Sequence, residues 1–340
     1  MHSSMSIPML VLNDTEIHSL LSFKCAIELV ESAFAADARH EVTTLPVISH
    51  LIERFQANFV VKAGHIELSS GLGSGRAVEV LGLKAGSFWG SSSKRGLPSH
   101  NAVMVMIEPE TGRPCALLAA NTLTTVRTAA AGAIASKYLA PKRSRSVAIL
   151  GAGEQGQAQL EALLEVKLIE RACVWDISAD AARAYAEFWS KQGLRTEASP
   201  SVKDAVRDAQ IIVTATPARS PILKSEYVTR GVHINAVGSD SNKKQEIQAQ
   251  LVARCRTIVD KREQSISIGE MRVPLQQGLV NEAHIEGELG EICAGLKPGR
   301  RSDDELTLFD SSGVSFQDLI VADYVIRAAT EQKLGQHILV

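Results

Sequence analysis

Residues 147–163 read VAILGAGEQGQAQLEAL, and this stretch decides the fold of the chain. Its first four residues are apolar, as in a buried strand, and apolar residues at helical spacing follow. Between them Gly151, Gly153 and Gly156 form the pattern G-x-G-x-x-G. In this context the pattern predicts a tight strand-to-helix turn that binds the pyrophosphate of a dinucleotide at the helix N-terminus.

An acidic residue follows at the spacing that such a turn requires. Asp176 lies 20 residues after Gly156, at the end of the next predicted strand. A carboxylate there accepts hydrogen bonds from the adenosine ribose and repels a 2′-phosphate. Residues 177–180 contain no Arg or Lys, so the sequence favours NAD(H) over NADP(H).

The composition favours a globular protein of about two domains. The chain has 340 residues, 45% of them apolar, and a net charge of −2. The short basic runs at 142–145 and 299–301 are expected to be solvated loop charges, so no nucleic-acid partner is predicted. No His or Cys cluster has the spacing of a metal site, and we expect no metal.

Cysteine usage and hydropathy favour the cytoplasm. The five cysteines contain no C-x-x-C pair, which fits a reducing compartment, and four of them are expected to be small buried apolar residues: Cys25, Cys115, Cys173 and Cys293. No signal peptide is evident, and no apolar run approaches the length of a membrane span, so no membrane partner is expected.

The pattern of predicted elements changes along the chain. Residues 9–12 read as a strand, followed by a helical turn capped by Asp14 or Thr15 and a helix over 23–38 capped by Ser22. Residues 44–118 predict a mainly antiparallel sheet, with turns at 71–75 and 109–112.

A helix over 121–139 begins the second half. Strands and helices then alternate to residue 259, which predicts a parallel, doubly wound sheet of the Rossmann type. Residues 261–315 read as irregular and helical, and a final helix is expected from 316 to about 331. The fold class is therefore α/β, with a smaller α+β domain beside the Rossmann domain.

Several segments together resemble the ornithine cyclodeaminase/mu-crystallin family. Besides the glycine-rich stretch they are GLKAGSFW (82–89), GLPSHNAVMVMIEPETGRPCALL (96–118), TLTTVRTAAAGAIASKYLAPK (122–142), AVGSD (236–240) and LGEICAGLKPGRRSDDELTLFDSSGVSFQDL (289–319). The resemblance implies a homodimer. It also implies a substrate-binding and dimerisation domain made of residues 1–120 with 316–340, and an NAD-binding domain made of 121–315.

Two cations are the expected substrate-binding residues. Lys84 lies in an apolar strand, where a buried lysine must meet an anion or else point to solvent. Arg127 lies among small residues, where it can form either an internal salt bridge or a fork on a carboxylate. The resemblance implies that both bind the substrate carboxylate and that Lys84 is also catalytic.

Asp240 follows the predicted strand 234–237 and could simply cap the next helix. The resemblance of AVGSD to the family instead implies that Asp240 acts on the substrate amine as a catalytic residue. His100 either lines the substrate pocket or caps a loop. The other expected cofactor contacts are Thr128, Glu154, Gln155, Ala215, Thr216, Val237, Ser312 and Gly313. For Ala215, Thr216, Ser312 and Gly313 the alternative is ordinary turn chemistry.

Two segments depart from the family pattern. Residues 47–49 lack an Arg that many members use to bind the substrate carboxylate. Binding of the carboxylate is therefore expected to rest on Lys84 and Arg127, with help from Arg54 or His50. Residues 85–93 read AGSFWGSSS, unlike the corresponding segment of cyclodeaminases.

The leading functional hypothesis is an NAD(H)-dependent oxidoreductase that interconverts an L-amino acid and its imine or 2-oxo acid, in the manner of an iminosuccinate or ketimine reductase or an alanine dehydrogenase. The alternatives are a cyclodeaminase that recycles NAD and releases ammonia, and a mu-crystallin-like binding protein.

Overall fold

The computed structural model describes residues 8–55, 57–68 and 78–339. The chain divides into two compact units, here called the first unit (Met1–Arg127 with Val314–Val340) and the second unit (Thr128–Gly313). The predicted turn at 71–75 lies outside the described residues.

The described part of the first unit is built on an eight-stranded sheet in the order β16-β1-β7-β6-β5-β4-β2, with β3 also paired to β4. Its strands are β1 (Pro8–Leu12), β2 (Val42–Thr44), β3 (Ile48–Ile52), β4 (Ala57–Leu68), β5 (Val78–Phe88), β6 (His100–Ile107), β7 (Pro114–Ala119) and β16 (Gln336–Leu339). The described pairs are antiparallel except for β1 with β7, so the prediction of a mainly antiparallel sheet is confirmed.

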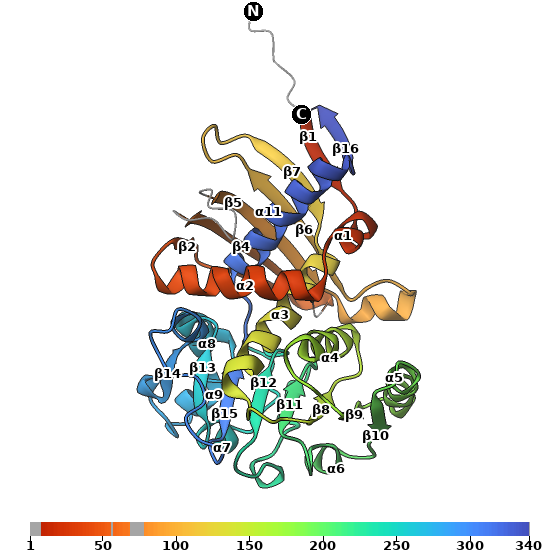
Figure 1. The fold of residues 1–340 in the computed structure, drawn as a ribbon, viewed down its shortest axis with the longest axis vertical. Coiled ribbons are helices and arrows are strands. Elements are labelled where there is room, and N and C mark those ends of the chain that lie inside the picture. The colour runs from red at the N-terminus through yellow and green to blue at the C-terminus, as the bar shows by residue number, and fades with distance from the viewer. Residues whose placement is uncertain (1–7, 56, 69–77, 340) are drawn as a thin grey trace, which may run out of the picture. The chain divides into compact units, whose positions relative to one another are not determined.

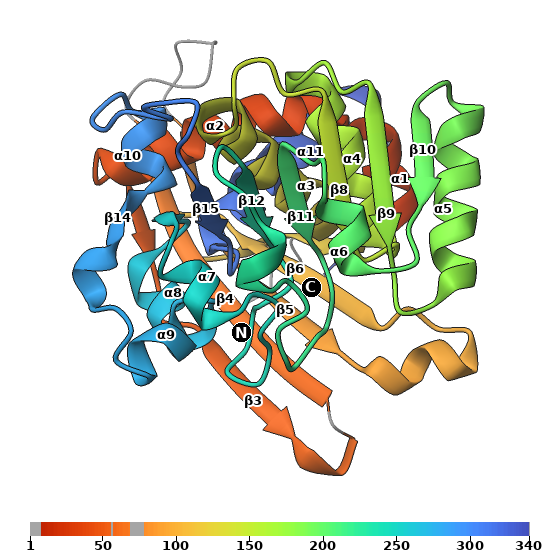
Figure 2. The same ribbon diagram turned by 90° about the horizontal axis from the view of Figure 1, so that it is seen from below.

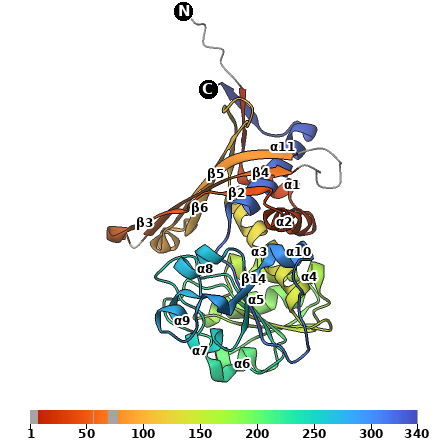
Figure 3. The ribbon, with the colours of Figure 1, turned by 90° about the vertical axis from the view of Figure 1, so that its left-hand side faces the viewer.

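Helices of the first unit cover one face of this sheet, as Figure 3 shows for α2 and α11. They are α1 (Asp14–Leu20), α2 (Phe23–Ala38) and α11 (Ser315–Gln332), with 3₁₀ turns η1 (Glu53–Phe55) and η2 (Gly90–Arg95). Ser22 caps α2 as predicted. The predicted cap of α1 is wrong, because Asn13 caps that helix and forms a capping box with Glu16.

Glycines bring α11 close to the sheet. A Cβ atom on Gly64 would lie 2.6 Å from Ser315 Oγ, and one on Gly82 would lie 3.1 Å from Leu319 Cδ2. The aromatic rings of Phe34 and Phe316 meet edge to face at 5.2 Å, which joins α2 to α11. This close packing places the first turn of α11 against β5.

The second unit holds an eight-stranded sheet in the order β10-β9-β8-β11-β12-β15-β13-β14. Its strands are β8 (Ser146–Leu150), β9 (Arg171–Trp175), β10 (Arg195–Ala198), β11 (Ile211–Thr214), β12 (His233–Ala236), β13 (Arg256–Val259), β14 (Ile285–Glu288) and β15 (Thr307–Asp310). The described pairs are all parallel. Figures 1 and 2 show these strands side by side.

Both faces of this parallel sheet are covered. Its helices and 3₁₀ turns are α4 (Glu154–Val166), α5 (Ala179–Lys191), α6 (Val202–Val206), α7 (Ala249–Val252), α8 (Arg262–Ile268), α9 (Arg272–Gln276), α10 (Leu289–Cys293), η3 (Ser225–Tyr227) and η4 (Glu282–His284), while α3 (Asn121–Leu139) begins in the first unit. Along β8, Val147 and Ile149 pack in one apolar cluster, whereas Ala148 and Leu150 pack in another. Alternate residues therefore face opposite layers, and the predicted doubly wound α/β fold is confirmed.

The expectation that residues 261–315 are irregular and helical is only partly right, because α8, α9 and α10 lie there but two strands were missed. These strands are β14 and β15, and β15 lies in the sheet between β12 and β13 with all four residues buried. A short strand buried on both faces shows no polar alternation, so its sequence lacks the usual signal of a strand.

The cysteine expectation is only partly right. All five cysteines are free, but Cys115 is exposed and Cys25, Cys173 and Cys293 are only half-buried, while Cys255 is buried. Within the part of the chain that the structure describes, no helix is both long enough and apolar enough to cross a membrane.

Candidate functional site

The carboxyl ends of five neighbouring strands form one row in the second unit. The register pairs Leu150 with Thr214, Thr214 with Ala236, and Ala236 with Asp310, and Val259 completes the row beside Asp310. The residues that follow each strand therefore lie along a single edge. In open α/β sheets, ligands bind in the crevice at this edge.

The glycine-rich turn begins at this edge, after β8. Gly151 has a φ of +115°, a conformation that side chains strongly disfavour. A Cβ atom on Gly156 would collide with the carbonyl oxygen of Gly151, so the close approach of turn and helix requires glycine there. Nothing lies within 4 Å of the Cβ position of Gly153, which is the N-cap of α4 and supplies no capping side chain.

These features fit a bound dinucleotide. The first turn of α4 offers backbone N–H groups to an anion, and the open side of Gly153 lets a pyrophosphate approach the backbone. Gln155 Oε1 is buried and has no hydrogen-bond partner in the structure. The predicted contacts Gly151, Gly153, Glu154, Gln155 and Gly156 are thus brought together in one turn.

Asp176 stands directly after β9, next to this turn. Its carboxylate accepts hydrogen bonds from Ala152 N and Ser178 N, each at 2.8 Å. The side chain therefore braces the glycine-rich turn while remaining half-buried. Ile177 beside it is 94% exposed, and it offers an apolar surface that the sequence reasoning did not consider.

Three further groups of predicted cofactor contacts lie in the second unit. Ala215, Thr216 and Val237 directly follow the ends of β11 and β12. Ser312 and Gly313 follow β15, where Ser312 Oγ donates to Asp260 Oδ1 at 3.0 Å. Thr128 lies in α3, and its carbonyl oxygen accepts a hydrogen bond from Gln159 Nε2 at 3.1 Å.

Asp240 lies in the loop after β12, at the same edge of the sheet. Its side chain is 52% exposed, and its Oδ1 pairs with Lys244 Nζ at 2.7 Å. Asp240 is therefore an accessible carboxylate that one neighbouring cation orients.

Lys84 and Arg127 meet in the first unit on a carboxylate that the sequence analysis did not identify. Lys84 Nζ donates to Asp318 Oδ1 at 2.7 Å and to Thr124 Oγ1 at 3.2 Å. Arg127 Nε donates to the same Asp318 oxygen at 2.8 Å, and its Nη1 donates to Gln317 Oε1 at 2.7 Å. Lys84 and Arg127 are both 5% exposed and Asp318 is 1% exposed. Lys84 therefore meets an anion rather than solvent, and Arg127 forms an internal salt bridge.

Polar atoms around this cluster remain unpaired. Asp318 Oδ2 and Gln317 Nε2 are both buried and have no hydrogen-bond partner. Two cations share one carboxylate, so the trio carries more positive than negative charge when Lys84 is protonated. An additional anionic or polar group would satisfy this arrangement.

Burial and charge also change the acidity of the trio. Burial and then the charge of Arg127 lower the pKa of Lys84 to about 7, although Asp318 opposes them. Burial alone would raise the pKa of Asp318, but the charges of Arg127 and Lys84 together hold it below its ordinary value. Near neutral pH, Lys84 can therefore gain or lose a proton, as a general acid or base does.

Other basic side chains of the first unit lie on the strands and turns of its sheet. Lys62 is the register partner of Lys84 on the adjacent strand, so both side chains lie on the same face. His100 begins β6, and its Nε2 lies 3.8 Å from the Cβ position of Gly86. Arg54 stacks over Phe55 at 5.4 Å, and His50 is exposed on β3.

The local signal at Asp318 is a carboxylate in a mostly apolar helical stretch, FQDLIVADYVI, which contains a second carboxylate at Asp323. Lys84, the partner of Asp318, is 234 residues away in the chain, so no local pattern links the two. Gln317 and Thr124 escaped notice for the same reason.

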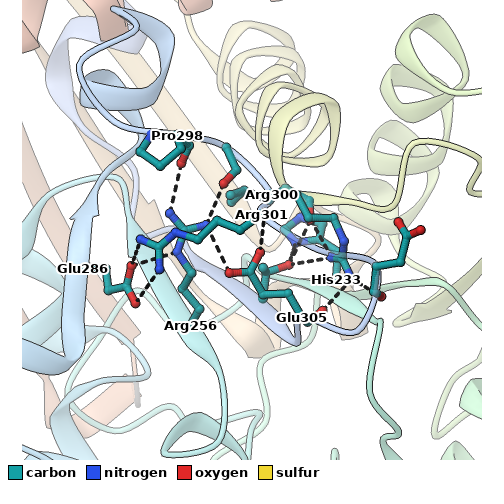
Figure 4. Close-up of polar contacts among 11 residues, drawn as sticks. His233, Arg256, Glu286, Pro298, Arg300, Arg301 and Glu305 are labelled. Carbon is teal, nitrogen blue, oxygen red and sulfur yellow. Dashed lines mark hydrogen bonds and ion pairs between the residues drawn. The ribbon is translucent and has the colours of Figure 1, made fainter.

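A second polar cluster closes the opposite, amino-terminal edge of the parallel sheet (Figure 4). Arg256 is 8% exposed, pairs with Glu286 at 2.8 Å, and donates to the carbonyl oxygens of Pro298 and Gly299. Arg300 donates to the carbonyl oxygen of Leu139 at 2.8 Å. The expectation that residues 299–301 carry only solvated charges is therefore wrong for Arg300.

His233 belongs to the same cluster and is buried. Its ring nitrogens lie 2.9 Å from Thr307 Oγ1 and from Asn235 Oδ1, and burial lowers its pKa to about 3. It is therefore neutral at physiological pH. This cluster joins the strands β12, β13, β14 and β15, and we assign it a structural role.

A parallel, doubly wound sheet with a glycine-rich first turn and an acid after the second strand defines a dinucleotide-binding α/β protein. The chain belongs to the ornithine cyclodeaminase/mu-crystallin family, whose family model matches residues 8–333. The resemblance noted in the sequence is thereby confirmed.

Individual relatives agree over almost the whole chain. The iminosuccinate reductase of Paracoccus denitrificans is 36% identical over 97% of this chain and 99% of its own length. The Thermococcus litoralis Δ1-pyrroline-2-carboxylate reductase, solved with NADH and L-proline, superposes with a TM-score of 0.91 at 33% identity, covering 97% of this chain and 100% of that one. An archaeal alanine dehydrogenase dimer with bound NAD also has a TM-score of 0.91, at 34% identity, covering 98% and 99% of the two chains.

Proposed function

We propose that this protein is an NAD(H)-dependent oxidoreductase that interconverts an L-amino acid and its imine or 2-oxo acid, and that it acts mainly as an imino acid reductase. The observation that carries the proposal is the buried pair Lys84 and Arg127, which converges on a single carboxylate oxygen. The same chain holds a turn that fits a dinucleotide. The names and NAD(H) complexes of its relatives support the same reaction class.

Lys84 and Arg127 hold the substrate carboxylate in this proposal. Both donors are almost completely shielded from solvent, which strengthens their hydrogen bonds to an anion. Asp318 fixes the two cations by accepting from both of them. A substrate that enters thus meets donors whose positions are already set, and its Cα is oriented for reaction.

Asp240 keeps the substrate nitrogen protonated, so that the imine reacts as an iminium cation. An accessible carboxylate suits this role because it attracts the cation and can exchange protons with solvent. Lys84 is the second group able to move a proton, since its pKa is about 7. When bound, NADH supplies the hydride.

A dicarboxylic imino acid is the substrate class that we place first. Lys62 faces Lys84 across the strand pair, and its charge lowers the pKa of both Lys84 and Asp318. Lys62 thus places a second cation on the face of the sheet that carries Lys84, where it can attract a second carboxylate of the substrate. The relative from P. denitrificans is named an iminosuccinate reductase, which supports a dicarboxylic substrate.

The decisive assay follows NADH absorbance with ammonia and a panel of 2-oxo or imino acids: oxaloacetate, pyruvate, glyoxylate and Δ1-pyrroline-2-carboxylate. We expect ammonia-dependent oxidation of NADH that is fastest with oxaloacetate. Ornithine with NAD is assayed in parallel. Release of ammonia from ornithine without net NADH would instead identify a cyclodeaminase. Binding of NADH without either turnover would favour a binding protein.

Asp176 is expected to set the choice of coenzyme. In the variant D176N a neutral side chain can still accept a hydrogen bond, but it no longer repels a 2′-phosphate. We expect the ratio of kcat/KM for NADH over NADPH to fall by about tenfold or more. D208N is the matched control, because it removes the same charge from an exposed loop just before β11. An unchanged ratio in folded D176N would contradict this role.

The affinity for the substrate carboxylate should depend on the protonation of Lys84. Because the pKa of Lys84 is about 7, we expect the affinity for the reactive 2-oxo acid to weaken as pH rises through that value. Asp318 raises the pKa of Lys84, so D318N should move this weakening to lower pH. Calorimetric titration with the 2-oxo acid, without NADH and ammonia, measures both curves. Superimposable curves would show that Asp318 does not tune Lys84.

We further propose that the protein is a homodimer that works in the cytoplasm. The face of the first sheet opposite α2 and α11 carries an apolar patch in which Phe59 is 39% and Val103 37% exposed. Other apolar side chains share that face through the strand register: Val61, Leu83, Val105 and Leu117. A second copy would cover them, and the archaeal alanine dehydrogenase is a dimer. Light scattering tests the assembly, since a dimer has twice the 36.5 kDa mass of the chain.

The proposal of a cytoplasmic location is supported by the free cysteines, which are compatible with a reducing compartment.

A further inference from the structure

Glu246 connects two of the loops at the carboxyl edge of the second unit. Its side chain is fully buried and accepts four hydrogen bonds. Thr214 Oγ1, Thr216 N and Thr216 Oγ1 donate at 2.7 Å, and Gly238 N donates at 2.9 Å. One carboxylate thus holds the ends of β11 and β12 together, on loops that contain the expected cofactor contacts Thr216 and Val237.

Two more buried acids support Glu246 in series. The backbone N–H of Glu246 donates to Glu270 Oε1 at 2.7 Å, and the backbone N–H of Glu270 donates to Asp310 Oδ2 at 2.9 Å. Ser265 Oγ donates to the same oxygen of Asp310. We call Glu246, Glu270 and Asp310 the carboxylate relay. In it the carboxylate of Asp310 binds the backbone N–H of Glu270, and the carboxylate of Glu270 binds the backbone N–H of Glu246.

Glycines allow close approach at both ends of the relay. A Cβ atom on Gly238 would lie 2.5 Å from Glu246 Oε2, and one on Gly269 would overlap Asp310 Oδ2. In both places a side chain would push the carboxylate away from the backbone. The sequence thus has glycine where the relay needs the main chain to come close.

Burying three carboxylates costs more free energy than a purely structural role would justify. The three acids of the relay are at most 1% exposed, and burial raises the pKa of each of them. A buried carboxylate is destabilising unless donors surround it, and apolar residues of similar size would fill the same space at lower cost. What carboxylates provide is orientation, since they turn specific N–H and O–H groups inward.

We propose that Glu246 is a positioning residue for the coenzyme, which acts by holding the Thr214–Thr216 and Val237–Gly238 segments in the conformation that binds the dinucleotide. This inference rests on the proposed function, because it assumes that these segments contact NAD(H). Glu270 holds the backbone N–H of Glu246 in place, and Asp310 does the same for Glu270.

The test compares E246Q with wild type by titrating NADH and following its fluorescence, and by recording the melting temperature. The amide keeps the size of the side chain but presents an N–H₂ group to donors that need an acceptor. We expect the Kd for NADH to rise about 10- to 100-fold, because displaced loops lose the bound geometry. E246D, which restores the charge, should recover part of the affinity.

E286Q is the matched control, since Glu286 lies in the cluster at the opposite edge of the same sheet. It should lower the melting temperature and leave the Kd for NADH unchanged. If E246Q also lowers only the melting temperature, the positioning role is overturned while the proposed function stands. If wild type itself fails to bind NADH, the proposed function fails first.

Should E246Q not fold, T214V replaces it, since this variant removes a single donor from the same carboxylate. A Kd for NADH raised about threefold or more would support the proposal, by the loss of one charge-assisted hydrogen bond. An unchanged Kd would overturn it.

Discussion

K84M is expected to lose activity on the order of 10³-fold in kcat/KM while its NADH affinity stays at the wild-type value. Methionine keeps the apolar stem of the lysine but removes both the cation and the transferable proton. In addition, Asp318 then faces Arg127 alone, so the trio loses the net positive charge that attracts a substrate carboxylate. The loss should therefore affect both KM and kcat.

The control for this variant is K24M, the same substitution at an exposed position of α2. It should retain wild-type activity. The melting temperature of K84M should change little, because Asp318 stays paired with Arg127 and the buried cluster becomes neutral. A folded K84M with kcat/KM within about threefold of wild type would refute the assignment of Lys84 to the substrate site.

D240N is expected to lower kcat by about 10²- to 10³-fold, with little change in the affinity for the 2-oxo acid measured without NADH. The amide has the shape of the carboxylate but cannot stabilise a protonated substrate nitrogen or exchange a proton with it. The chemical step should therefore suffer more than binding. Steady-state kinetics and calorimetry on the same preparation separate the two effects.

K244M distinguishes catalysis from a structural ion pair at this position. Lys244 is the partner of Asp240 at 2.7 Å, and removing it breaks the pair but keeps the carboxylate. We expect K244M to retain most of the kcat that D240N loses. Equal losses in both variants would mean that the pair only shapes the loop, and full turnover by D240N would remove Asp240 from the mechanism.

Much of the second unit was predictable because its signals are local. The strand Ser146–Leu150, the glycine turn and Asp176 are consecutive features of the chain, and each depends on backbone conformation or on spacing within one strand–helix–strand unit. The helix Asn121–Leu139 was predicted with its observed bounds. The strand Thr307–Asp310 was missed, because four residues buried on both faces carry no periodic signal.

The candidate site was only partly predictable. Lys84 and Arg127 stood out as cations in apolar surroundings, but their shared partner Asp318 did not, since the sequence shows no link across 234 residues. Glu246 likewise gave no sign of its role. Its partner Glu270 is 24 residues away in an irregular segment, and the bonds between them run through backbone N–H groups that any residue possesses.

The sequence by itself determined most of the order of the helices and strands, though not β14 and β15, together with the glycine-rich turn and the family. These features follow from conformational preference and periodicity along a few turns of chain. Only the tertiary structure decided which charges are buried and what compensates them. A buried lysine and arginine are tolerable only where a carboxylate meets them, and the approach of α11 to β5 through small residues such as Gly82 supplies Asp318. That pairing is long-range, and it selects the Lys84 and Arg127 site from among the cations of the chain.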